Sequence, residues 1–155
     1  MRLYLVRHGK AASSDVDPQR GLTEEGLREV KKVAEFIKPL DISVDYIRHS
    51  GKSRAVQTAE ILAEAVSVRE EIAAHTGLAP NDDVTPIRDE IESAEQDVMI
   101  VGHLPFVARL ASLLLTGSDA GYPIAFRESA IACLQQPTDN HWQINWMVTP
   151  EVVAG

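Results

Sequence analysis

The chain of 155 residues is 45% hydrophobic and 25% charged, a composition that predicts one globular domain spanning residues 1–155. Its formal net charge of −8 and sequence pI near 5.1 argue against a nucleic-acid partner, because nucleic-acid-binding proteins usually present a basic face. No apolar run approaches the roughly 20 residues of a membrane helix and the one cysteine excludes a disulfide framework, so we expect a cytoplasmic protein without a membrane partner.

Apolar patterning in the first half of the chain alternates between strand and helix. Residues 1–7 form a short apolar run, which predicts a buried strand at the start. Thr23 is expected to cap a helix that stops at Pro39. A second strand is expected over residues 43–49, followed by a helix with Ala55 and Leu62 on its apolar face.

The same alternation continues through the middle of the chain. Residues 68–74 predict a third strand, and Asn81 or Asp82 is expected to cap the helix that follows. The apolar stripe of that helix is formed by Val84, Ile87, Ile91 and Ala94. Residues 98–101 predict a fourth strand, which leads into a helix with Pro105 in its first turn. Residues 116–128 are expected to form a loop that could cover a site.

The last part of the chain has the pattern of a β-hairpin. Strands are expected over residues 129–134 and 142–148, joined by a polar turn that contains Pro137, Asp139 and Asn140. The second strand alternates polar or flexible residues with Trp142, Ile144, Trp146 and Val148. The complete order of elements predicts an α/β fold, a three-layer α/β/α sandwich around a mostly parallel sheet with an antiparallel C-terminal strand pairing.

Three polar clusters follow three of the predicted strands. The first strand ends in Arg7-His8-Gly9, the second in His49-Ser50 with Arg54 one turn later, and the fourth in Gly102-His103-Leu104-Pro105. In a sheet of this kind, ligands bind beyond the carboxyl ends of the strands. The sequence therefore predicts that these clusters form one site.

Each cluster also has a simpler interpretation. An Arg-His pair can lie on the surface, Arg54 can be a solvated helix residue, and His103 can be a neutral helix cap. Two or three histidines can also hold zinc. However, arginine repels a cation and binds phosphate with its planar fork of N–H groups. The mixture of arginines and histidines therefore favours a phosphate pocket with no metal and no cofactor.

These motifs resemble those of the histidine phosphatase superfamily, also called phosphoglycerate mutase-like. The resemblance covers nearly the whole chain and rests on Arg7-His8-Gly9, Ser50-x-x-x-Arg54-Ala55-x-Gln57-Thr58-Ala59, Gly102-His103-x-Pro105 and Arg20-x-Leu22-Thr23-x-x-Gly26. The short chain, and Leu104 where many relatives carry Asn, are similar to the SixA-type phosphohistidine phosphatases. Gly51 departs from the pattern, because many members have proline after the serine.

The resemblance implies a metal-independent phosphatase. His8 would be the nucleophile that forms a phosphohistidine intermediate, and Arg7, Arg54 and His103 would surround the phosphoryl oxygens. Arg20 occupies a position where relatives bring a further phosphate-facing residue. The implied substrate is phosphohistidine on a signalling or phosphotransfer protein. The sequence does not indicate the identity of that protein or the oligomeric state.

One expected group is missing from the sequence. Many superfamily members have an acidic proton donor after the third strand, but residues 75–80 contain no carboxylate, and Asp82 and Asp83 are expected to start the next helix. An alkoxide leaving group needs such an acid, whereas imidazole, with a pKa of about 6.5, needs far less help. Asp17 is either a substitute donor or a solvated loop residue.

Two alternative functions remain open at this point. The chain could be a phosphatase of small phosphoesters or phosphoanhydrides in the same superfamily. It could instead be an inactive phosphohistidine-binding adaptor, although such a module would be expected to have lost the nucleophile or the phosphate-binding arginines, and neither is lost here.

Overall fold

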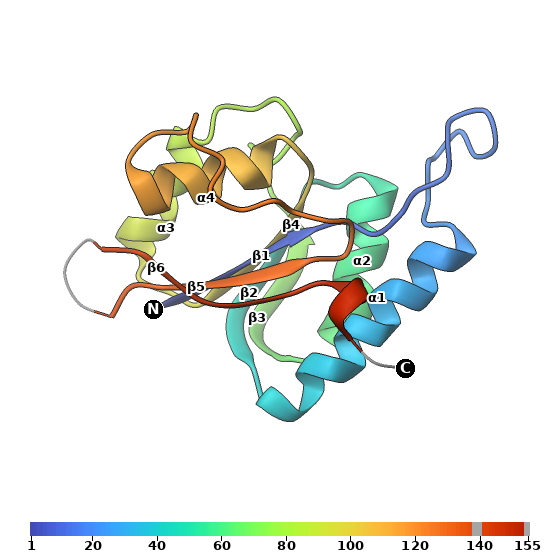
Figure 1. Cartoon of the computed structure of the whole chain (residues 1–155), viewed down its shortest axis with the longest axis horizontal. Coiled ribbons are helices and arrows are strands. Elements are labelled where there is room, and N and C mark those ends of the chain that lie inside the picture. The colour runs from blue at the N-terminus through green and yellow to red at the C-terminus, as the bar shows by residue number, and fades with distance from the viewer. Residues whose placement is uncertain (138–140, 154–155) are drawn as a thin grey trace.

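A computed structural model describes residues 1–137 and 141–153 and shows one mixed sheet with helices on both faces (Figure 1). The strands are β1 (Arg2–Arg7), β2 (Ser43–His49), β3 (Ser67–Ala74), β4 (Val98–Gly102), β5 (Ile131–Gln135) and β6 (Gln143–Val148). The helices are α1 (Glu24–Ile37), α2 (Ser53–Ala63), α3 (Thr85–Ala94) and α4 (Phe106–Thr116), with short 3₁₀ turns at Lys38–Leu40 and Pro150–Val152. No helix in these described ranges is long and apolar enough to cross a bilayer.

The strand order across the sheet is β3-β2-β4-β1-β5-β6. The pairs β3–β2, β2–β4 and β4–β1 are parallel, whereas β5 is antiparallel to both β1 and β6. The predicted parallel sheet with an antiparallel C-terminal hairpin is therefore confirmed. Because β1, β2 and β4 are adjacent and parallel, their carboxyl ends lie at the same edge of the sheet.

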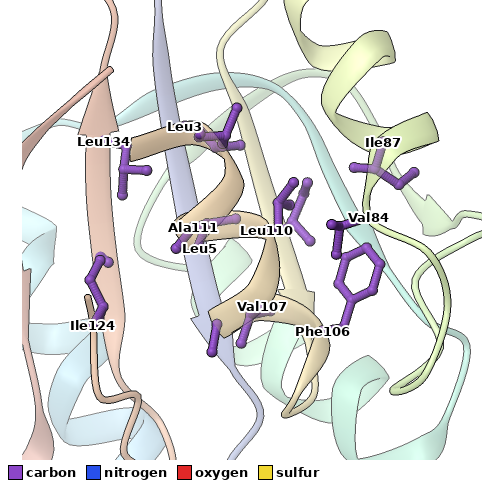
Figure 2. Packing of buried hydrophobic residues seen from close by; sticks show 14 of the residues in the cluster. Leu3, Leu5, Val84, Ile87, Phe106, Val107, Leu110, Ala111, Ile124 and Leu134 are labelled. Atoms are coloured by element: carbon purple, nitrogen blue, oxygen red, sulfur yellow. The ribbon is translucent and has the colours of Figure 1, made fainter. Parts of the chain in front are cut away.

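Two apolar cores, one on each face of the sheet, hold the layers together. On one face, Leu3 and Leu5 of β1 lie in the same buried cluster as Val107, Leu110 and Ala111 of α4 (Figure 2). On the other face, Tyr4 and Val6 belong to a cluster to which α1 and α2 contribute Val30, Val33, Ile37, Ala55, Ala59 and Leu62. β1 is thus buried on both faces, as expected for a central strand, and the predicted three-layer sandwich is confirmed.

The helix boundaries confirm one predicted cap and correct another. Thr23 caps α1, and its Oγ1 accepts a hydrogen bond from Gly26 N at 3.0 Å. The cap predicted at Asn81 or Asp82 is wrong, because α3 begins only at Thr85. The Asp82 carboxylate instead closes the preceding loop by accepting from Ala79 N at 2.9 Å. Asp83, which we also expected inside the helix, accepts from Thr85 N at 3.0 Å.

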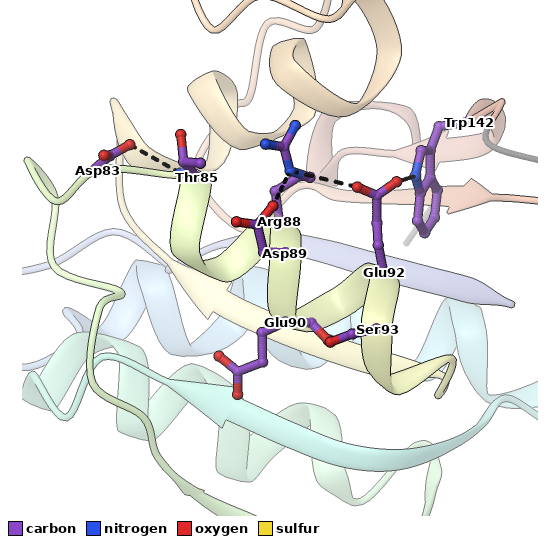
Figure 3. A network of polar contacts seen from close by, with 8 residues as sticks. All are labelled: Asp83, Thr85, Arg88, Asp89, Glu90, Glu92, Ser93 and Trp142. Atoms are coloured by element: carbon purple, nitrogen blue, oxygen red, sulfur yellow. Dashed lines mark hydrogen bonds and ion pairs between the residues drawn. The ribbon is translucent and has the colours of Figure 1, made fainter.

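A polar network connects the outer face of α3 to the C-terminal hairpin (Figure 3). Arg88 Nε lies 2.7 Å from Asp89 Oδ1 and 3.5 Å from Glu92 Oε1, and the Trp142 indole N–H donates to Glu92 Oε2 at 3.5 Å. The predicted apolar stripe of α3 is correct except at its end. Ala94 is exposed, because Glu95 has a left-handed backbone (φ 53°) that ends the helix there.

The hairpin differs in detail from its predicted pattern. β5 begins at Ile131, two residues later than expected, and the turn residues Asp139 and Asn140 lie outside the described residues. A bulge in β6 opposite Cys133 and Leu134 interrupts its alternation. Consequently Trp142 packs in the core beside α4 and Val148 in the core beside α1 and α2, while Ile144 is exposed.

Candidate active site

The sheet register brings the three polar clusters together. Arg7 at the end of β1 pairs with Gly102 of β4, and His49 at the end of β2 pairs with Val101 of the same strand. His8 and His103 therefore follow neighbouring strands, and their ring centroids are 5.0 Å apart with the planes inclined at 55°. The three polar clusters therefore lie at one edge of the sheet, as predicted.

His8 is held in one tautomer by the backbone beside it. Its side chain is buried, and Nδ1 lies 2.7 Å from Gly9 O. A carbonyl oxygen can only accept, so Nδ1 carries the proton and Nε2 keeps a lone pair. Burial, followed by the positive charges of Arg54, Arg7 and Arg20, lowers the His8 pKa to about 4, although the bond to Gly9 O opposes the shift. At neutral pH the free ring is therefore uncharged, and its Nε2 lone pair is available to attack an electrophile.

His103 lies deeper than His8 and is only 2% exposed. Its Nε2 is 2.6 Å from Ser50 Oγ, whereas its buried Nδ1 has no hydrogen-bond partner among the described residues. Burial lowers the His103 pKa to about 3, with further contributions from His8 and Arg54. A bound anion would reverse part of this effect, because negative charge stabilises an imidazolium.

Two arginines, Arg7 and Arg54, flank the imidazoles. Arg7 donates from Nη1 to Phe126 O at 3.1 Å, so the loop before β5 holds its guanidinium in place, and its buried Nε has no partner within the described part of the chain. Arg54 lies in the first turn of α2, where burial and the nearby Arg20 lower its pKa. Among the described residues, neither arginine forms an ion pair with an acidic side chain, so both charges remain available to an anion.

Arg20 and Asp17 lie in the loop between β1 and α1. Arg20 is exposed, has a left-handed backbone (φ 51°), and donates from Nε to Ala12 O at 3.2 Å. The Asp17 carboxylate accepts from Gln19 N at 3.0 Å and from Gly21 N at 2.9 Å. Both Asp17 oxygens thus stabilise the turn that carries Arg20, an arrangement that the sequence interpretation did not include.

Two further polar residues, Gln57 and Thr58, connect α2 to the site. Thr58 is fully buried, donates from Oγ1 to Arg54 O at 2.7 Å and accepts from Gly9 N at 3.0 Å. Gln57 Oε1 accepts from Leu22 N at 2.7 Å and so fixes the end of the loop. Both residues belong to the motif that resembles the family, but the sequence alone assigns them no role. The sequence signal that could have indicated these roles is the pair of adjacent polar residues, Gln57 and Thr58, on the side of α2 that faces the strand ends.

The end of β3 acquires a carboxylate from a distant element. His75 Nε2 lies 2.9 Å from Glu90 Oε1 of α3, and Arg48 Nη1 lies 3.4 Å from the same oxygen. The Arg48 guanidinium also stacks 4.4 Å above the centre of the Tyr46 ring. Residues 75–80 contain no acid, but the fold supplies one from α3. Within residues 1–137 and 141–153, no three His, Cys, Asp or Glu side chains form a potential metal-binding group.

This geometry contains the parts that phosphoryl transfer to an imidazole requires. A neutral ring with a free Nε2 can attack phosphorus, and a fixed Nδ1–H stabilises the cationic ring that results. Guanidinium groups and a second imidazole can balance the charge on the three equatorial oxygens of the transition state.

Comparison with known proteins connects this site with a family. The model of the histidine phosphatase superfamily (branch 1) matches residues 3–79, which contain the first two polar clusters. The chain is 26% identical over 155 residues to the phosphohistidine phosphatase SixA of Escherichia coli, covering 97% of this chain and 94% of that protein. It is 32% identical over 158 residues to an uncharacterized protein of Picosynechococcus, covering 90% of this chain and 92% of that protein.

The fold comparison agrees with the sequence comparison. A solved structure of the protein histidine phosphatase SixA complexed with tungstate superposes with a TM-score of 0.84 at 26% identity, covering 97% of each chain. Similarity over nearly the full length thus accompanies the family match in the first half. The chain belongs to the histidine phosphatase superfamily.

Proposed function

We propose that this chain is a phosphohistidine phosphatase, a hydrolase that transfers the phosphoryl group of a phosphorylated histidine to His8 and then to water. The observation that carries the proposal is the state of His8. Its Nδ1–H is committed to Gly9 O at 2.7 Å, which leaves Nε2 as the free nucleophile beside His103. The full-length similarity to SixA supports phosphohistidine as the substrate class.

The reaction takes two displacements at phosphorus. In the first, His8 Nε2 forms a bond to phosphorus, the bond from phosphorus to the substrate imidazole breaks, and that imidazole takes a proton from solvent. In the second, water attacks phosphorus, the bond to His8 Nε2 breaks, and inorganic phosphate leaves. Arg7, Arg54 and His103 hold the phosphoryl oxygens in both steps. The bond from Nδ1–H to Gly9 O stabilises the positive charge of the phosphorylated ring.

The leaving group supports a phosphorylated protein as the substrate. Imidazole leaves without a strong acid, and Asp17 uses both its oxygens to hold backbone N–H groups. One observation favours the second candidate, a phosphatase of small phosphoesters. The Glu90 carboxylate lies 2.9 Å from His75, which directly follows β3, the strand after which many relatives carry their acidic proton donor.

We assign residues 1–155 to a single catalytic domain that works in the cytoplasm, where the lone buried Cys133 stays reduced. Its partner is a phosphorylated signalling or phosphotransfer protein, and the countercharge in the site comes from arginines without a metal.

The test is turnover of a phosphorylated histidine phosphotransfer domain beside p-nitrophenyl phosphate and phosphoserine. We expect fast phosphate release from the phosphohistidine protein, slower release from the aryl ester, and almost none from phosphoserine. Activity should survive exhaustive dialysis against EDTA, and tungstate should inhibit. Preference for small alkyl phosphates would favour the second candidate. Loss of activity with EDTA that added zinc or magnesium restores would overturn the metal-free mechanism.

A further inference from the structure

Ser50 connects the end of β2 to His103 through its hydroxyl group. It directly follows β2, and its Oγ lies 2.6 Å from His103 Nε2. The same Oγ accepts a hydrogen bond from Lys52 N at 3.3 Å, at the start of α2. The serine hydroxyl therefore bridges the ends of two neighbouring strands and the first turn of a helix.

The turn at Gly51 allows this bridge to form. Gly51 has φ 86°, a conformation that proline cannot adopt, and its N–H donates to His49 Nδ1 at 3.1 Å. The proline that the family pattern often has at this position could not adopt this φ, so the turn that presents Ser50 depends on glycine. The departure noted in the sequence thus coincides with the backbone geometry that folds the Ser50 hydroxyl onto His103.

The hydrogen bonds around His103 distinguish its two neutral tautomers. If Nδ1 carried the proton, this buried N–H would have no hydrogen-bond acceptor among the described residues. If Nε2 carries the proton, it donates to Ser50 Oγ, and only an acceptor lone pair on Nδ1 is left without a partner. Orphaned buried N–H groups are rarer in proteins than under-used acceptors. The Nε2–H form is therefore favoured.

We infer that Ser50 is a positioning residue that holds His103 as the Nε2–H tautomer, ready to donate that hydrogen to a phosphoryl oxygen. The inference rests on the proposed phosphoryl-transfer function and adds a residue to it. Phosphoryl oxygens only accept hydrogen bonds, so an Nε2 without a proton would face them lone pair to lone pair. With its proton, Nε2 can pass from Ser50 Oγ to the phosphoryl group when substrate binds.

The pH dependence of a Ser50 variant separates positioning from a packing role. Without Ser50, a neutral His103 is free to place its proton on Nδ1, and only a second proton restores the donor at Nε2. In the free protein His103 binds that proton only near pH 3, but the negative charge of a bound phosphoryl group stabilises the imidazolium and raises its pKa. Lowering the pH should therefore recover part of the lost kcat, which reports the substrate complex. The charged and titratable groups around His103 are His8, Arg54, Lys52 and Arg20. His8 has a pKa of about 4 and stays neutral across a comparison between pH 5 and pH 8.

The experiment compares Ser50→Ala, Ser50→Thr and the remote control Ser93→Ala, which removes a hydroxyl from the exposed face of α3. We expect Ser50→Ala to lower kcat by about tenfold at pH 8, with KM changed less. The deficit should shrink toward pH 5. Ser50→Thr should restore most of the rate, and Ser93→Ala should equal the wild type. A deficit that is the same at pH 5 and pH 8 would overturn the inference.

A second measurement does not depend on turnover. Two-dimensional ¹⁵N–¹H spectra of imidazole-labelled protein report which ring nitrogen of His103 carries the proton. We expect Nε2–H in the wild type and in Ser50→Thr, and a shift toward Nδ1–H in Ser50→Ala. An Nδ1–H signal in the wild type would overturn the inference even if Ser50→Ala failed to fold. A wild type that has the expected tautomer but ignores phosphohistidine would contradict the substrate assignment alone.

Discussion

The strand ends and the loop between β1 and α1 both bring polar groups to the same site, but they hold them differently. His8 and His103 follow adjacent strands, are buried, and are fixed by the sheet, with His8 N donating to Gly102 O at 3.0 Å. Arg20 is exposed on a loop that depends on the Asp17 carboxylate and on Gln57. The groups that must meet phosphorus within tenths of an ångström are therefore on the rigid part, and the adaptable part carries an accessory charge.

The largest effect should come from the nucleophile itself. His8→Ala should lower turnover by at least about 10³-fold, because no second ring nitrogen can replace Nε2. The far-ultraviolet circular dichroism should stay unchanged, since the ring lies at a strand end outside the two apolar cores. His141→Ala, a change at an exposed histidine near the start of β6, is the matched control. Retained turnover in a folded His8→Ala protein would place the nucleophile elsewhere.

The next largest effect should come from the leaving group. Its test compares two possible proton donors, one in the loop between β1 and α1 and one in α3. We expect rates to fall steeply from phosphohistidine through aryl phosphates to alkyl phosphates, because residues 75–80 contain no carboxylate and both Asp17 oxygens accept from backbone N–H groups. Asp17→Asn and Glu90→Gln separate the two possible donors. A shallow dependence in the wild type that steepens in one variant would identify that residue as the acid. A shallow dependence in all three proteins would remove the argument for phosphohistidine.

The buried histidines should make the fold sensitive to acid. The unfolded chain binds protons on imidazoles near pH 6.5, whereas folded His8 binds one only near pH 4. Between these values the unfolded state holds more protons, so the free energy of unfolding falls as the pH falls. The loss for His8 alone should be on the order of 3 kcal/mol. Urea denaturation at pH 7.5 and pH 4.5 measures it, and His8→Asn should show a smaller loss than the wild type.

The sequence indicates the central part of the site more accurately than its surroundings. Residues such as His8 and His103 follow apolar strands directly, so the rule that parallel strands end at one edge places them together. The Thr23 cap is likewise a local signal. In contrast, Glu90 reaches His75 through the packing of α3 on the sheet, and the sequence around residue 75 does not predict this contact. The bulge in β6 is also a property of strand pairing, not of one strand.

The roles of Ser50 and Asp17 lie between these extremes. Both stand in recognisable positions, but what they do depends on hydrogen bonds to specific atoms. Asp82 is the opposite case, because the sequence predicts a role for it that the structure does not contain. The sequence around Asp82 is typical of a helix cap, but its carboxylate accepts a hydrogen bond from Ala79 N, three residues earlier in the loop. Short polar side chains offer the backbone several competing partners, and only the folded chain selects among them.

The smallest effect should come from Arg20, the accessory arginine, because it lies on the loop and not at a strand end. Arg54→Ala removes a partly buried charge that no acidic side chain of the described residues neutralises, and should lower kcat by about 100-fold. Arg20→Ala removes an exposed charge and should raise KM by no more than about fivefold, with kcat nearly unchanged. Both rates are measured with a phosphohistidine protein at low and high salt, since screening weakens only the exposed charge.

Asp17→Asn keeps the size of the side chain while weakening the bonds to Gln19 N and Gly21 N, so it should reproduce the Arg20→Ala effect by loosening the loop. Equal losses of kcat in Arg20→Ala and Arg54→Ala would mean that the loop closes over the substrate and that the division between a rigid and an accessory part does not hold.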